Sequence, residues 1–84
     1  MRSADDAKRA AARRAVVQYL AQNPQASDSV AGIASWWLRG EGVRVTHDLL
    51  RETLESLVVE GRISRRRLPD GTVLYAAAAD TGEA

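Results

Sequence analysis

Residues 46–75 read THDLLRETLESLVVEGRISRRRLPDGTVLY, and this stretch carries the clearest structural signal in the chain. Thr46 is a good helix N-cap, and apolar side chains then recur at intervals of three and four residues. This spacing predicts an amphipathic helix from Thr46 to about Glu60, and Gly61 suits the left-handed position that follows a helix. The apolar face of the expected helix consists of Leu49, Leu50, Thr53, Leu54, Leu57 and Val58.

The residues after this helix change to a pattern typical of a β-hairpin. The tetrapeptide LPDG at 68–71 fits a type I turn followed by a glycine in the left-handed bulge position. We therefore expect strands over 62–68 and 72–77, joined by a three-residue loop. This register places Ile63 roughly opposite Ala77.

The first part of the chain predicts another helix, from Ala4 to about Gln22, with Ser3 as its N-cap. An apolar stripe occurs at helical spacing, and the Asn-Pro pair at 23–24 ends the pattern because a residue before proline avoids helical geometry. The stripe consists of Ala12, Val16, Tyr19 and Leu20.

A short second helix is expected from Val30 to Leu38, after turn-forming residues at 23–29. Asp28 or Ser29 would cap it. Within it, helical projection places Trp37 in the core and Trp36 at the edge of the core. We expect a break at 40–42 and a short extended piece at 43–45.

The composition describes one small domain, which we expect to span residues 1–77 and to be followed by a disordered tail at 78–84. The chain has 84 residues, of which 45% are apolar, and a net charge of +1. It contains no Cys and one His, so we expect no disulfide, metal site, cofactor or catalytic residue, and no enzymatic activity. No apolar run reaches the length of a membrane span, which makes a cytoplasmic protein the expectation. The preference for Arg over Lys suggests a bacterial coding background.

Three helices followed by a hairpin resemble the winged helix-turn-helix domain. The run from Leu54 and Leu57 through Gly61 to Ile63 looks like the passage from recognition helix to wing in bacterial regulators of the MarR and PadR kinds. The resemblance covers roughly residues 5–77. It implies a small α+β winged-helix fold, double-stranded DNA as the partner, and a role in transcription regulation in a bacterium or phage. The segment between the second and third helices is longer here than the usual tight turn.

The resemblance implies that the third helix enters the major groove while the hairpin, or wing, contacts the DNA backbone. The residues expected to face the bases are Thr46, His47 and Arg51. Those expected at the backbone are Arg44, Arg62, Arg65, Arg66 and Arg67. A strand alternates its faces, so Arg65 and Arg67 would share one side and Arg66 the other.

The charges also allow other interpretations. The outer face of the third helix carries the carboxylates Asp48, Glu52 and Glu55, which would repel phosphate. A solvated helix face with an Arg51–Glu55 pair is the other interpretation of these carboxylates. The arginines of the hairpin could simply protect an edge strand from aggregation.

The alternative function is a protein-interaction module on the same fold. It would use the acidic face of the third helix or the edge at Trp36, since Trp is enriched at interface hot spots. Leu38 or Val59 would then extend the apolar patch. A DNA reader of this size is expected to act as a homodimer, because one recognition helix binds weakly alone.

Overall fold

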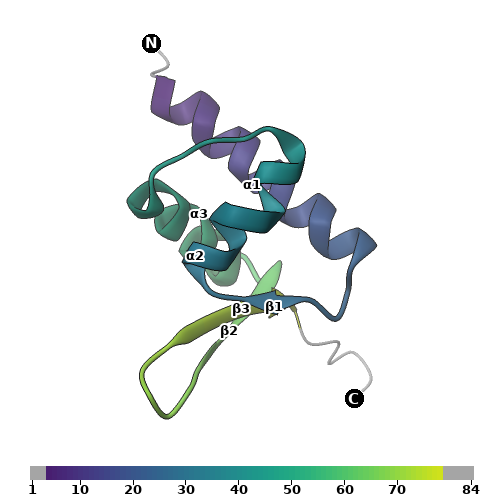
Figure 1. The fold of residues 1–84 in the computed structure, drawn as a ribbon, viewed down its shortest axis with the longest axis vertical. Coiled ribbons are helices and arrows are strands. Elements are labelled where there is room, and N and C mark those ends of the chain that lie inside the picture. The colour runs from purple at the N-terminus through teal and green to yellow at the C-terminus, as the bar shows by residue number, and fades with distance from the viewer. Residues whose placement is uncertain (1–3, 79–84) are drawn as a thin grey trace.

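The computed structural model describes residues 4–78, in which three helical segments pack on a three-stranded antiparallel sheet (Figure 1). Helix α1 spans Ala4–Gln22, as expected, and buries Ala12, Ala15, Val16 and Leu20. The backbone N–H and the side-chain amide of Asn23 both donate to the carbonyl of Tyr19, and Pro24 follows. The expected N-cap, Ser3, lies outside the described residues, as do residues 79–84 of the expected tail.

The first strand, β1, was not expected. It spans Ser27–Asp28 and pairs with β3, so that the sheet has the order β1-β3-β2. The sequence predicts a turn at this point, because two residues are too few to show the alternating pattern of a strand. β1 covers the edge of β3 at Tyr75 and Ala76, whereas β2 is an edge strand of the sheet along its whole length.

The second helical segment differs from the regular helix that we expected. Its first turn, α2 (Val30–Gly32), is capped by the Ser29 side chain, and it continues as a π-helix, η1 (Ile33–Trp37). The Leu38 N–H donates to the Ile33 carbonyl five residues earlier, at 3.0 Å, which widens the turn. Trp37 and the adjacent Leu38 are therefore both buried, whereas Trp36 is 68% exposed.

This geometry confirms the expected positions of the two tryptophans and corrects the position of Leu38. Leu38 is a core residue and cannot belong to an exposed patch around Trp36. A 3-10 turn, η2 (Arg39–Glu41), follows, and Gly42 adopts a left-handed φ of 73°. Residues 43–45, where we expected a short extended piece, pair with no strand and link η2 to the next helix.

Helix α3 spans His47–Val59 and matches the expected helix closely. The Thr46 hydroxyl accepts from the Leu49 N–H at 3.1 Å, which is the expected N-cap. At the other end, the Arg62 N–H donates to the Leu57 carbonyl and the Gly61 N–H to the Val58 carbonyl, with Gly61 at φ 77°. These two bonds form a Schellman motif, and they turn the chain directly into the hairpin.

The hairpin consists of β2 (Ile63–Arg67) and β3 (Val73–Ala77), and its register confirms the prediction. Ile63 lies opposite Ala77, and Arg67 lies opposite Val73. Gly71 has a φ of 94°, as the loop requires, and its N–H donates to the carbonyl of Leu68. In Figure 1 the hairpin extends beyond the helices at the lower left.

The core lies between α1, α3, the second helical segment and the base of the hairpin. Tyr19 of α1 stacks on Trp37, with ring centroids 4.6 Å apart. The members of the core are Ala12, Ala15, Val16, Leu20, Ile33, Trp37, Leu38, Leu50, Leu54, Leu57, Ile63 and Tyr75. The element order and the wing-like hairpin show the small α+β, winged-helix-like layout that the sequence predicts. None of the helices within residues 4–78 has the length and apolarity that a membrane span requires.

Candidate nucleic-acid interface

A hollow of about 490 Å³ separates the outer face of α3 from the hairpin. Three of the predicted arginines line it: Arg51 from α3, and Arg65 and Arg67 from β2. The two strand residues share this face because side chains two apart on a strand point the same way. Its other lining residues are Val30, Glu55, Val73 and Tyr75.

Glu55 connects α3 to both strands of the hairpin. The buried Tyr75 hydroxyl donates to its Oε2 atom at 2.7 Å, and the Arg65 guanidinium donates to its Oε1 atom. These bonds hold the pKa of Glu55 below its ordinary value, with the Tyr75 hydroxyl as the larger cause. Burial and the bond to Glu55 raise the pKa of Tyr75 to about 12.

The prediction of an Arg51–Glu55 ion pair is therefore wrong. Arg51 instead contacts Asp48 at 3.4 Å, one turn earlier on α3. Glu55 turns toward the sheet because two hydrogen bonds, from the Arg65 guanidinium and the Tyr75 hydroxyl, stabilise its half-buried carboxylate. One exposed ion pair with Arg51 on the same helix would stabilise it less. This connection could not be predicted from the sequence, because Glu55 and Tyr75 are twenty residues apart and neither belongs to a motif.

The other carboxylates of α3 and its C-cap also have cationic partners. Glu52 accepts from Arg9 of α1 at 3.0 Å. Glu60 accepts two bonds from Arg13, at 2.7 and 2.9 Å, which lower the pKa of Glu60 and raise that of Arg13. Such exposed pairs add little stability. They do offset the negative charge that made the α3 face look unfavourable for phosphate.

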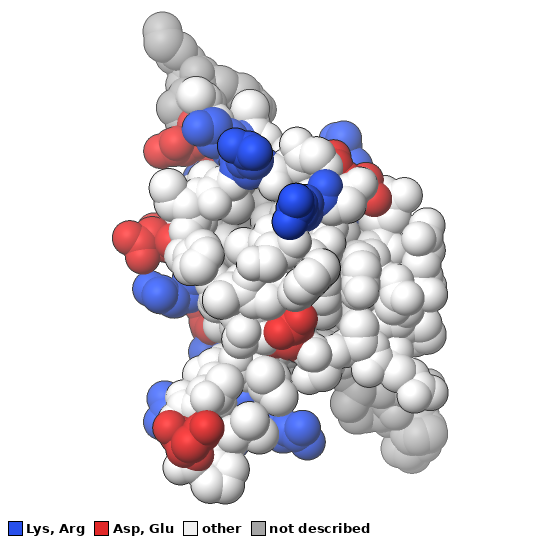
Figure 2. Space-filling view, in the orientation of Figure 1, with Lys and Arg blue, Asp and Glu red and all other residues white. Residues whose placement is uncertain are grey.

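The hairpin arginines differ in what they contact. Arg65 is bound to Glu55, whereas the side chains of Arg66 and Arg67 form no ion pair within residues 4–78. Arg66 lies on the face of β2 opposite to the hollow, as alternation predicts. Figure 2 shows Lys and Arg atoms on both sides of the hairpin, at the foot of the view.

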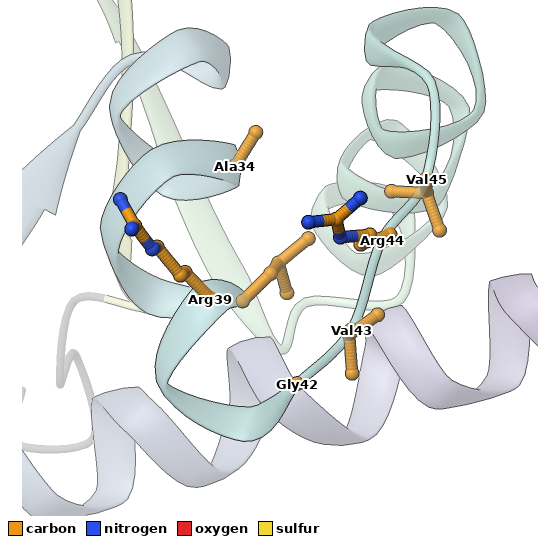
Figure 3. A pocket seen from close by; sticks show the side chains of 7 residues that line it. Ala34, Arg39, Gly42, Val43, Arg44 and Val45 are labelled. Carbon is orange, nitrogen blue, oxygen red and sulfur yellow. The ribbon is translucent and has the colours of Figure 1, made fainter.

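Two predicted arginines lie in other places. Arg62 lines a groove on α1 together with Arg13 and Arg14. Arg44 lines a hollow beside the second helical segment, together with Arg39 (Figure 3). The structure therefore brings Arg51, Arg65 and Arg67 together but places neither Arg62 nor Arg44 in that group.

The two remaining predicted residues begin α3. The Thr46 hydroxyl already caps the helix, and His47 occupies the first helical position, where it is exposed. Among the described residues there is no group of three or more His, Cys, Asp or Glu side chains that could hold a metal ion.

Comparisons of this chain with protein-family models, with curated proteins and with solved structures find no match.

Proposed function

We propose that this domain binds double-stranded DNA, with the N-terminal turn of α3 at the base edges and the hairpin along the backbone, as in winged-helix regulators of the MarR and PadR kinds. The observation that supports the proposal most directly is the cluster of Arg51, Arg65 and Arg67 around one hollow between α3 and the hairpin. Arg66 adds a second cationic face to the same strand. Guanidinium groups bind phosphate through charge-assisted hydrogen bonds, so this arrangement suits a DNA backbone.

The charge pairing on α3 supports the same function. Asp48, Glu52 and Glu55 each have an arginine partner, so the helix presents matched charges rather than three free carboxylates. His47 is exposed at the start of α3, and Arg51 would exchange its exposed 3.4 Å contact with Asp48 for a base edge in the major groove. Two copies of the domain would bind neighbouring half-sites, since one module makes few contacts.

The test is a fluorescence-anisotropy titration of a labelled, short, mixed-sequence duplex. We expect affinity to fall steeply between about 50 mM and about 200 mM salt, because phosphate binding releases counterions. The Arg66→Ala/Arg67→Ala double variant should weaken binding by at least about tenfold at low salt and reduce the salt slope by about two.

The matched control is the Lys8→Ala/Arg14→Ala double variant, which removes the same charge from α1. It should bind nearly as the unchanged domain does. Equal weakening by both double variants would mean that net charge, and not the hairpin, attracts the duplex. No binding at low salt would contradict the proposal, because non-specific attraction is strongest there.

The exposed Trp36 favours a second candidate function, a protein-interaction module. Trp36 is 68% exposed on a π-helix, and residues 29–38 contain no charged side chain. If this surface is the functional one, the domain leaves DNA unbound at low salt. Its self-association or partner binding would then weaken by about 2 kcal/mol in Trp36→Ala, as measured by sedimentation, but not in Val59→Ala, a second exposed apolar position.

A further inference from the structure

A further hollow, outside the candidate interface, lies between the second helical segment and the residues that lead into α3. Its volume is about 580 Å³, which falls within the range of small-molecule sites. Ala34, Leu38, Val43 and Val45 supply apolar lining, and Gly42 forms one end. The hollow was not apparent from the sequence, because it depends on the 3-10 turn and on the irregular path of residues 43–45.

Backbone hydrogen bonds hold the shape of this hollow. The Val43 N–H donates to the Leu38 carbonyl, and the Gly42 N–H donates to the Arg39 carbonyl, both at 3.0 Å. Gly42 makes the reversal possible by adopting a left-handed φ of 73°. A ligand would therefore meet a largely preformed site, which reduces the cost of ordering the protein on binding.

The charged residues that line the hollow are both arginines. Figure 3 shows Arg44 extending into the hollow toward Ala34, while Arg39 extends along the outer side of the helical segment. Both are exposed, and neither forms an ion pair in the part of the chain that the structure describes. By contrast, Arg9, Arg13, Arg51 and Arg65 all have carboxylate partners.

We propose that this hollow binds a small organic anion, in which a carboxylate meets the guanidinium of Arg44 and an apolar body contacts the half-buried side chains of Ala34, Val43 and Val45. Arg39 lines the same hollow, and rotation of its exposed side chain would bring a second guanidinium toward the carboxylate. An inorganic ion would satisfy the arginines but would leave the apolar lining uncovered, so the favoured ligand combines both features. This inference does not depend on DNA binding.

The test uses 2-naphthoate as the probe, with inorganic phosphate and the neutral 2-naphthalenemethanol as comparisons, in ¹⁵N-HSQC titrations of the full chain. We expect 2-naphthoate to shift the amides of residues 34–45 saturably, with a Kd of about 1 mM or below. The alcohol lacks the charge and phosphate lacks the apolar body, so each should bind at least about tenfold more weakly.

Glutamine variants identify the residues responsible, since they keep length and polarity while removing the charge. We expect Arg44→Gln to weaken naphthoate binding about tenfold and Arg39→Gln to weaken it less, while Arg14→Gln on α1 leaves it unchanged. All three positions are exposed, so the spectra of the variants should otherwise keep the dispersion of the folded domain.

Three results would overturn the proposal. Naphthoate could leave residues 34–45 unshifted. It could bind equally well to Arg44→Gln. Phosphate could bind as tightly as naphthoate, in which case the two arginines form a plain anion contact, such as one to a DNA phosphate, and the apolar lining has no part in binding.

Discussion

Leu54→Ala is expected to lower the free energy of unfolding by about 2–5 kcal/mol. Leu54 lies in the middle of α3, is fully buried, and belongs to the core that joins this helix to α1 and the hairpin. A domain of this length has a total stability of roughly 4–12 kcal/mol. The cavity left by the missing side chain would therefore remove a large share of the stability. A loss of about 5 kcal/mol would unfold the domain if its total stability lies near the lower end of its range.

The measurement is urea denaturation followed by circular dichroism at the helix band. Val59→Ala is the matched control, because Val59 is on the same helix but is 85% exposed. The control should change the free energy of unfolding by no more than about 0.5 kcal/mol. Similar losses in both variants would show that α3 does not pack on the core as described.

Stability should also fall as the pH rises above 10, and Tyr75 should account for a large part of the fall. The hydroxyl of Tyr75 is buried against Glu55, and its pKa is raised to about 12, from an ordinary value of 10. The unfolded chain therefore loses this proton first. The stabilising contribution is fully present below pH 10 and is lost as the pH rises through 12, a change of about 3 kcal/mol.

Tyr75→Phe isolates this effect. The variant should be less stable at neutral pH by about 1–2 kcal/mol, because the half-buried Glu55 loses its donor, and it should lose little further stability between pH 10 and 12. Tyr19→Phe is the control, since it keeps the stack on Trp37 and leaves the Tyr75–Glu55 bond in place. A Tyr75→Phe variant with the same alkaline loss as the unchanged domain would exclude this origin.

The contribution of Glu55 to stability depends on pH in the opposite direction, and it is lost at acid pH. Its pKa lies below the ordinary value, so its contribution is fully present above pH 4.5 and is lost as the pH falls through the lowered pKa. Denaturation curves from pH 7 downward should show a smaller acid loss in Tyr75→Phe, where the main cause of the shift is gone.

The parts of the fold that follow from local sequence were predicted well. The bounds of α1 and α3, the Thr46 cap and the hairpin register each depend on residues close together in the chain. Strand β1 and the π-helix depend instead on distant partners. β1 exists because β3 offers an open edge at Ala76 and Tyr75, and the π-helix brings two adjacent large side chains, Trp37 and Leu38, into one core.

In the candidate interface, too, features set by local sequence could be predicted, whereas features set by tertiary packing could not. Strand alternation was enough to place Arg65 and Arg67 on one face and Arg66 on the other. The separation of Arg44 and Arg62 from that face, and the ion pairs of Glu52 and Glu60 with α1, depend on how the elements pack. DNA binding by the hairpin and α3 stays a prediction.

The π-helix also sets how this segment can change in length. Its wide turn contains one residue more than an α-helical turn, so the chain holds a spare residue between Ile33 and Leu38. If one residue were deleted there, the turn could return to ordinary α-helical hydrogen bonds. The residue lost would correspond to the exposed Trp36. An inserted residue could not be accommodated by the same change in hydrogen bonding. Related chains should therefore vary in length at this turn in one direction only, toward the shorter form.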